Sequence, residues 1–201
     1  MSPEDVDECL RVRNACLQIH PRLINLTPGS DAEPGCTVVS YPPEIEAEVD
    51  NIYKQMYDEH ISIDDVINLL QRNKTSSNPH DKEIFSCMLH FLFDEYKFFQ
   101  SFYPPRELAM TGYLFGSIIQ YHLLEFVALG VAVRYILDAL SCPPTTNLFR
   151  FGVQALSRFE SRLGEWQPLC HHLLEMPHLL EARPELSAII HRAIEIGRAH
   201  V

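Results

Sequence analysis

The sequence predicts an all-α protein in which about eight or nine helices form antiparallel hairpins stacked as a HEAT-type solenoid. Apolar residues recur at steps of three and four along most of the chain, which is the period of an amphipathic helix. Proline-marked turns separate these segments, and helix pairs recur roughly every 40 residues, a spacing typical of HEAT repeats. Only Thr37-Val38-Val39 suggests extended chain, so no sheet is expected.

The composition is that of an ordinary globular protein. The chain has 201 residues, of which 46% are hydrophobic and 21% are charged, and a chain of this size buries about 70% of its surface on folding. One domain, or at most two small ones, is expected, and disorder throughout the chain is excluded. The net charge of -11 disfavours direct binding to nucleic acid or to a membrane surface, because both normally need a surplus of Lys and Arg.

Two segments are expected before the main domain. Ser2 and Pro3 place a cap and a first-turn proline before an N-terminal helix, which we assign to residues 1–21. Residues 22–42 form a linker rich in Pro, Gly, Ser and Thr. The acidic first residues do not fit a secretory signal, and none of the six cysteines belongs to a CxxC pair. We therefore expect reduced thiols and a cytoplasmic location, with the nucleus as the open alternative.

Residues 43–197 are expected to form a HEAT-repeat protein-interaction domain, and residues 198–201 a frayed end or a remnant of cloning. Apolar spacing and proline positions predict helices in the following segments: Pro43 to about Tyr57, Ile63 past Leu70, Pro79 to about Gln100, Pro105 to about Ile119, Leu123 to Leu140, Leu148 to Leu163, Trp166 to Leu174, and Pro184 onward.

Local signals support several of these helix ends. Ser62 with Asp65 resembles a capping box in which Asp replaces Glu. Asn78 followed by Pro79 is typical of a cap and a first-turn proline, and Gly164 is expected to cap the end of its helix.

Two features concern how the helices pack. Gly112 and Gly116 are small residues that allow neighbouring helices to approach closely. The longest apolar stretch, Leu123–Leu140, is interrupted by three charged residues, so it is interpreted as a buried core helix and not as a membrane span.

No catalytic or cofactor-binding motif is present in the sequence. The patterns of serine hydrolases, zinc proteases, phosphate-binding loops and dinucleotide-binding loops are all missing. The run Cys170–His172 with His178 suggests zinc, but adjacent His residues on a helix point about 100° apart and cannot easily share one metal. Cys87 and His90 lie one turn apart among apolar residues, which favours a core thiol and a partly buried imidazole. The sequence therefore predicts a non-enzyme without a metal or a cofactor.

Aromatic residues cluster in the first half of the chain and suggest a binding surface: Tyr41, Tyr53, Tyr57, Phe91, Phe98, Phe99, Phe102 and Tyr103. The inward stripe of the helix from Pro43 is expected to comprise four apolar residues, namely Ile45, Val49, Ile52 and Met56. Tyr53 and Tyr57 lie beside this stripe, and we expect their hydroxyl groups to face water in a groove that holds an amphipathic guest helix. Core packing is the alternative for these two rings, and it accounts for most of the Phe residues.

Several whole segments of the chain resemble one family. The segments that carry the resemblance are Asn51–Tyr57, Ser62–Arg72, Glu83–Leu89, Leu92–Phe99, Tyr103-Pro104, Glu107-Leu108, Leu114–Gly116, Ala128–Tyr135 and Ala155–Phe159. Together they look like the HEAT-repeat, MIF4G-like domain in the central part of the large Not scaffold subunit of the Ccr-Not deadenylase complex. The resemblance runs in order over about residues 40–182.

The resemblance implies a scaffold that acts in mRNA deadenylation, decay and translational repression, while other subunits of the complex remove poly(A). In animal relatives this domain docks a short helical peptide of tristetraprolin, an mRNA-binding decay factor, in an apolar groove. Carried over to this chain, the groove residues are Tyr53 and Tyr57, with Ile52 and Met56 close by.

Two departures from the family affect this expectation. The family has Phe where this chain has Tyr53, which bears on the choice of guest peptide, and the turn Thr75–His80 also differs. The alternative function is a docking surface for another Ccr-Not subunit or for a different RNA-binding adaptor.

Overall fold

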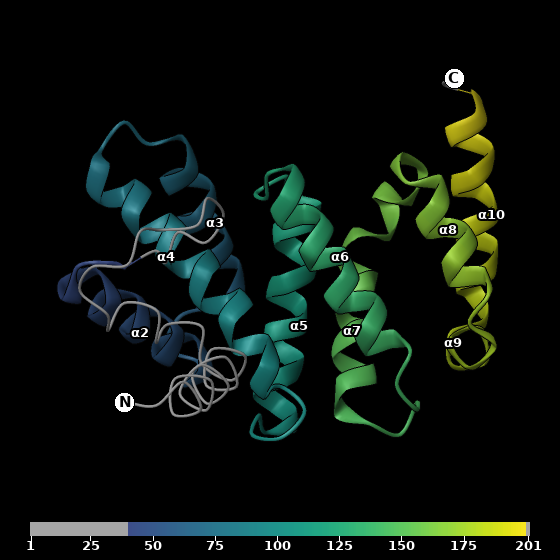
Figure 1. The fold of residues 1–201 in the computed structure, drawn as a ribbon, viewed down its shortest axis with the longest axis horizontal. Coiled ribbons are helices and arrows are strands. Elements are labelled where there is room, and N and C mark those ends of the chain that lie inside the picture. The colour runs from purple at the N-terminus through teal and green to yellow at the C-terminus, as the bar shows by residue number, and fades with distance from the viewer. Residues whose placement is uncertain (1–39, 200–201) are drawn as a thin grey trace, which may run out of the picture. The chain divides into compact units, whose positions relative to one another are not determined.

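The computed structural model describes residues 40–199, and in this range it is entirely helical. The described residues form nine α-helices and two 3₁₀ helices: α2 (Pro43–Tyr57), α3 (Ile63–Thr75), α4 (Pro79–Glu95), η2 (Tyr96–Phe98), α5 (Pro105–Gln120), α6 (Phe126–Leu140), α7 (Asn147–Phe159), η3 (Glu160–Glu165), α8 (Gln167–Leu174), α9 (Pro177–Ala182) and α10 (Pro184–Ala199) (Figure 1). The all-α prediction is confirmed. The predicted N-terminal helix at 1–21 and nearly all of the linker lie outside the described residues.

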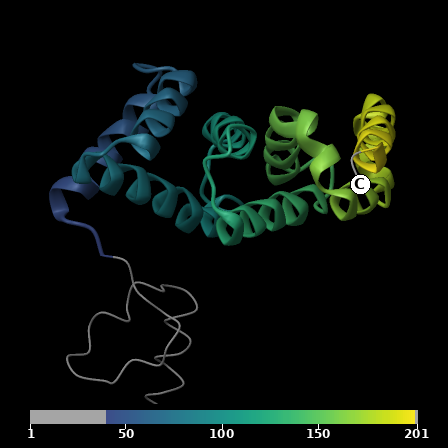
Figure 2. The same ribbon diagram turned by 90° about the horizontal axis from the view of Figure 1, so that it is seen from above.

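The residues from Pro43 onward form one compact unit, in which helices follow one another in chain order. Figures 1 and 2 show α2 at one end of this unit and α10 at the other. The principal contacts join helices that are one to three places apart in the chain, as in α2 with α4, α5 with α7 and η3 with α10. Such near-neighbour packing is typical of stacked helical repeats, so the predicted solenoid arrangement is confirmed.

Side-chain caps begin α3 and α4. The Ser62 hydroxyl accepts a hydrogen bond from the Asp65 amide at 3.1 Å, and the Asp65 carboxylate accepts one from the Ser62 amide at 3.1 Å. The Ser62 hydroxyl also donates to the Asp65 carboxylate at 2.6 Å, and this bond, together with the one from the Ser62 amide, holds the pKa of Asp65 below its usual range. Asn78 accepts a hydrogen bond from the His80 amide at 3.1 Å, directly before Pro79. Both predicted caps are confirmed.

Glycine residues place α5 directly against the backbone of α7. A Cβ atom on Gly112 would lie 2.9 Å from the Phe151 carbonyl oxygen, and a Cβ atom on Gly116 would lie 2.1 Å from the Ala155 carbonyl oxygen. Both distances are too short for a real side chain, so only glycine permits this contact. The predicted close approach is therefore confirmed, with α7 as the neighbouring helix.

Several helix ends in the second half differ from the prediction. Gly164 does not cap a helix but lies inside η3, and the helix α9 between Pro177 and Ala182 was not predicted. The helix α10 extends to Ala199, which lies two residues inside the segment 198–201 for which a frayed end was expected. A Cβ atom on Gly197 would lie 2.8 Å from the Gly164 carbonyl oxygen, so the last turns of α10 pack closely against η3.

The prediction that Leu123–Leu140 is a buried core helix is correct for only one face of the helix. α6 begins only at Phe126, whose side chain is 92% exposed, and the neighbouring Val127 is 79% exposed. The opposite face, with Ile136 and Leu140, is buried. The reason is that α6 packs on α7 and α5 along one side, while its apolar residues surround the whole helix. Within residues 40–199, no helix combines the length and the apolar character needed to cross a bilayer.

The contact between α5 and α7 predicts opposite effects for two Gly→Ala substitutions. Gly116→Ala should lower the free energy of unfolding by about 1–3 kcal/mol, because the added methyl group collides with the Ala155 backbone. Gly130→Ala on α6 is the matched control, since nothing lies within 4 Å of its Cβ position. It should raise the free energy of unfolding by about 0.5–1 kcal/mol through helix propensity. Urea unfolding measures both, and a Gly116→Ala protein as stable as the wild type contradicts the close contact.

Candidate functional site

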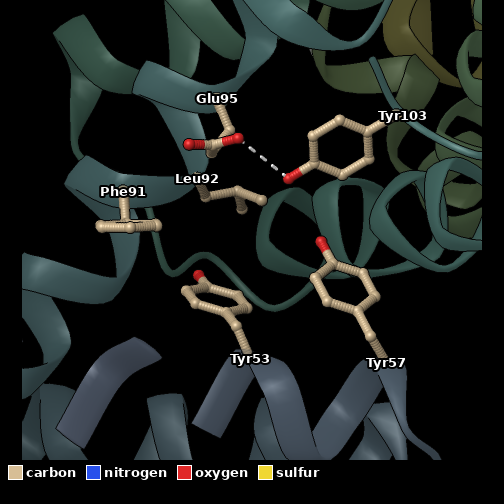
Figure 3. A pocket seen from close by; sticks show the side chains of 6 residues that line it. All are labelled: Tyr53, Tyr57, Phe91, Leu92, Glu95 and Tyr103. Atoms are coloured by element: carbon tan, nitrogen blue, oxygen red, sulfur yellow. Dashed lines mark hydrogen bonds between the residues drawn. The ribbon is translucent and has the colours of Figure 1, made fainter. Parts of the chain in front are cut away.

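An apolar hollow lies between α2, α4 and the start of α5. Its inner part has a volume of about 140 Å³ and is lined by Tyr53, Tyr57, Phe91, Leu92, Glu95 and Tyr103 (Figure 3). An outer part of about 500 Å³ is lined by Tyr57, Glu95, Phe98, Phe102, Tyr103, Pro104 and Glu107. The two parts share Tyr57, Glu95 and Tyr103, so we treat them as one feature and call it the aromatic slot.

Aromatic rings from three elements form the walls of the aromatic slot. Tyr53 of α2 stacks on Phe91 of α4, with 6.1 Å between the ring centres. It also stacks on Tyr57 of α2, with 6.5 Å between the ring centres. Tyr57 meets the edge of Tyr103, which precedes α5, at 6.3 Å. Figure 3 shows Tyr53 and Tyr57 rising from α2 toward Leu92 and Tyr103. The slot therefore presents ring faces and edges, which suit an apolar or aromatic guest side chain.

The hydroxyl group of Tyr53 does not face water, contrary to the prediction. Its side chain is 7% exposed, and the hydroxyl donates a hydrogen bond to the Met88 carbonyl oxygen at 2.8 Å. The buried stripe of α2 comprises Ile45, Val49, Tyr53 and Met56, with Tyr53 in the place expected for Ile52. Ile52 lies three residues after Val49 and Tyr53 lies four residues after it, and both steps lead to the same face of a helix. A carbonyl acceptor on α4 lets the phenol be buried without losing its hydrogen bond.

The four residues predicted to bind a peptide therefore divide into two pairs. Tyr53 and Tyr57 line the aromatic slot. Met56 is completely buried in the core, and Ile52 is half-buried and does not line the slot. A direct contact of Met56 with a guest would need the core to open, and a peptide-binding role for Ile52 and Met56 stays a prediction. A peptide-binding role for Tyr53 and Tyr57 stays a prediction.

A chain of hydrogen bonds connects Tyr57 to α5. The Thr111 hydroxyl donates to the Glu107 carbonyl oxygen at 2.7 Å, so its proton is already used. The Tyr57 hydroxyl, 2.8 Å from the Thr111 hydroxyl oxygen, must then be the donor in the second bond. Burial raises the pKa of Tyr57, and burial raises the pKa of Tyr53 well above its usual range. Both phenols are therefore neutral donors at physiological pH.

Two carboxylates lie at the mouth of the otherwise apolar slot. Glu95 accepts a hydrogen bond from the Tyr103 hydroxyl at 3.2 Å, and burial together with the neighbouring Tyr57 raises the pKa of Tyr103 far above its usual range. Glu107 has one buried carboxylate oxygen, Oε2, for which the described part of the chain supplies no hydrogen-bond partner. An acceptor of this kind is costly when it stays unpaired.

Most of the slot was not assigned from the sequence. Phe91, Phe98, Phe102 and Tyr103 belong to the predicted aromatic cluster, but nothing in their spacing shows that they face α2. Glu95 and Glu107 were missed altogether, since carboxylates on helices usually face solvent. Among these residues, only Tyr103 has a local sequence signal for its position, because it directly precedes the helix break at Pro104-Pro105.

The four residues that suggested a zinc site differ in burial and in hydrogen-bond partners. His171 and His172 are exposed, whereas Cys170 is buried and its thiol donates to the Leu163 carbonyl oxygen at 3.1 Å. His178 is 2.7 Å from the Leu140 carbonyl oxygen. Among the side chains that the structure describes, no group of three or more His, Cys, Asp or Glu could hold a metal ion.

Comparison with known proteins gives a family for this architecture. The model of the CCR4-NOT transcription complex subunit 1 TTP binding domain matches residues 29–200, which is most of the chain. The chain belongs to this family. The resemblance drawn from the aromatic and helical segments of the sequence is therefore confirmed.

Three curated relatives support this family. The chain is 42% identical over 186 residues to general negative regulator of transcription subunit 1 of Schizosaccharomyces pombe, covering 91% of this chain and 9% of the relative. The protein of the same name from Saccharomyces cerevisiae is 36% identical over 181 residues, covering 89% and 8%. CCR4-NOT transcription complex subunit let-711 of Caenorhabditis elegans is 30% identical over 138 residues, covering 68% and 5%. The chain thus spans less than a tenth of each relative.

A solved structure shows the same fold. The N-terminal domain of the yeast Not1 matches with a TM-score of 0.72 and 38% sequence identity, covering 77% of this chain and 29% of that chain. At this identity the two chains share the family as well as the helical architecture.

The two aromatic positions at the ends of the slot should differ in their effect on stability. Tyr53→Ala should lower the free energy of unfolding by about 3 kcal/mol, because it removes a buried ring and leaves a cavity. Phe102→Ala should change it by less than about 0.5 kcal/mol, because that side chain is 76% exposed. Chemical unfolding followed by circular dichroism measures both, and equal losses contradict the placement of the two rings.

Proposed function

We propose that this domain is a non-catalytic docking module of a Ccr-Not scaffold subunit, and that its aromatic slot binds a short helical motif of an mRNA-binding regulator of the tristetraprolin type. The single observation that carries the proposal is an open slot of aromatic rings, with Phe102 exposed at its mouth. Through this contact the scaffold would bring the deadenylase to selected mRNAs and promote their decay and translational repression. We further propose that it acts in the cytoplasm, with the nucleus as a second compartment, without direct contact to nucleic acid or membrane.

The shape of the aromatic slot supports a helical guest. It lies between helices, and a groove of this kind binds the apolar face of an amphipathic helix through anchors spaced three and four residues apart. The inner part accommodates one side chain against Tyr53 and Phe91, and the outer part accommodates a second against Phe98 and Phe102. A short helix that folds as it binds loses conformational entropy, so a micromolar affinity is expected.

The charges of the aromatic slot support a guest that carries Lys or Arg. Glu95 and Glu107 both line the outer part, and Glu107 Oε2 is buried without a partner among the described residues. The whole chain also has a net charge of -11, which attracts a basic segment at long range. A basic side chain beside the apolar anchors would pair with Glu107 and stack on the neighbouring rings.

The proposal predicts that exposed Phe102 is an anchor for the guest. Phe102→Ala should weaken binding of purified tristetraprolin to the full chain by about tenfold or more, since a central aromatic residue often contributes over 1.4 kcal/mol. Phe126→Ala is the matched control, because that ring is 92% exposed on α6 and does not line the slot. It should leave the affinity unchanged in isothermal titration calorimetry.

Two results would contradict this proposal. If wild-type protein does not bind tristetraprolin while another Ccr-Not subunit or another RNA-binding adaptor binds and is sensitive to Phe102→Ala, the slot has a different guest. If Phe126→Ala weakens binding and Phe102→Ala does not, the docking surface lies on α6.

The charge argument gives a separate prediction for Glu107. Glu107→Gln should weaken tristetraprolin binding about threefold to tenfold at 0.05 M salt, and the difference from wild type should shrink at 0.5 M salt. Glu44→Gln, at an exposed position in the first turn of α2, removes the same charge outside the slot and should have little effect. Affinities measured by fluorescence anisotropy over a salt series test this. Equal losses in the two variants would mean that only the overall charge matters.

A further inference from the structure

We propose that the hydroxyl groups of Tyr53 and Tyr57 are positioning groups that hold α2 in place and keep the aromatic slot in the form that accepts a guest. This inference deepens the proposed function and rests on it for its binding consequences. Its structural part concerns the free protein alone. The two rings form a wall of the slot, and their hydroxyl groups bond to the neighbouring helices α4 and α5.

The first tie joins α2 to α4. The Tyr53 hydroxyl donates to the Met88 carbonyl oxygen at 2.8 Å in a buried environment. A carbonyl oxygen has two lone pairs, so Met88 can accept this bond in addition to the bond of its own helix. Met88 lies one turn before Phe91 and Leu92, which form the facing wall. The bond therefore sets the separation between the two walls of the inner part.

The second tie joins α2 to α5. The Tyr57 hydroxyl donates to the Thr111 hydroxyl oxygen at 2.8 Å, and the Thr111 hydroxyl donates to the Glu107 carbonyl oxygen at 2.7 Å. Thr111 is completely buried. Glu107 also lines the outer part of the slot, so the relay connects the wall at Tyr57 to the backbone of a residue that lines the outer part.

Both ties lie in the last turns of α2, where a helix is otherwise most easily deformed. α2 ends at Tyr57, and the backbone reverses at Glu59 with a positive φ of 59°. Backbone bonds close the helix end, for example from the Glu59 amide to the Met56 carbonyl oxygen at 3.1 Å, and two further side-chain contacts, of Arg106 to Glu59 and to the Tyr57 carbonyl oxygen, are exposed. Exposed ion pairs contribute little, so the hydroxyl bonds of Tyr53 and Tyr57 are the stronger side-chain restraint on this end. A slot held in this way need not be assembled at the moment of binding, which favours affinity.

Hydrogen exchange of the free protein tests the structural part. Tyr53→Phe and Tyr57→Phe keep the rings and remove only the hydroxyl groups, while Thr111→Val removes the acceptor of the second tie. Each should speed amide exchange in the second half of α2 about threefold to tenfold, as expected for the loss of one hydrogen bond. Tyr96→Phe is the matched control: its hydroxyl also donates to a helix carbonyl, that of Tyr135, at 2.8 Å, but Tyr96 does not line the slot. It should leave exchange in α2 unchanged.

Binding of tristetraprolin to the full chain tests the functional part. Tyr57→Phe should weaken the affinity about threefold to tenfold, with most of the loss in the association rate if the slot must first form. Tyr96→Phe should bind like the wild type. Stopped-flow or surface plasmon resonance measurements at a temperature well below unfolding separate this effect from a general loss of stability.

Each outcome bears on the inference. Unchanged exchange in α2, or an equal rise throughout the domain, overturns it, because the hydroxyl groups then do not act locally. Faster exchange in α2 with unchanged tristetraprolin affinity overturns the positioning role. If the wild-type chain does not bind tristetraprolin but exchange rises only in α2, the proposed function fails, whereas the inference that the hydroxyl groups fix the slot stands.

Discussion

The backbone contact between α5 and α7 is the constraint on which the rest of the domain depends. Gly116 and Gly112 bring α5 so close to α7 that no side chain fits between them. The helix α5 also contacts α2, because its Thr111 accepts the hydrogen bond of Tyr57. It carries Glu107 at the mouth of the aromatic slot as well. The position of α5 against α7 therefore determines where one wall of the slot lies. A contact in the centre of the stack thus sets the geometry of a site at its edge.

Burial of tyrosine hydroxyl groups has a second consequence, which concerns pH. Because burial raises the pKa of Tyr53 and of Tyr57 in the folded state, these phenols stay protonated when they would already ionise in the unfolded chain. Their contribution to stability is fully present below the ordinary tyrosine pKa and is lost as the pH rises above it. Across the physiological range the two phenols remain neutral donors, so the walls of the slot do not change with pH through these groups.

The sequence was informative where a local rule decides the structure. The cap at Ser62 and the contact of Gly116 follow from short-range chemistry, and both are found as predicted. It was not informative where two helical registers compete. Ile52 and Tyr53 are both compatible with the stripe that starts at Ile45, and the choice depends on whether α4 offers an acceptor, which no spacing in α2 reveals. Glu107 was missed for a related reason, since its burial results from packing of segments distant in sequence.

The free energy available at the aromatic slot explains why a short guest could suffice. Phe102 is 76% exposed, so covering its ring returns part of the roughly 1.5–3 kcal/mol that full burial of such a side chain contributes. A basic group that reaches Glu107 Oε2 would also relieve an unpaired buried acceptor, which costs about 1–3 kcal/mol. Neither contact alone offsets the entropy lost when a peptide folds and docks. Both together do so only if they are made at once, which requires a guest with an aromatic-sized anchor and a cation on one face.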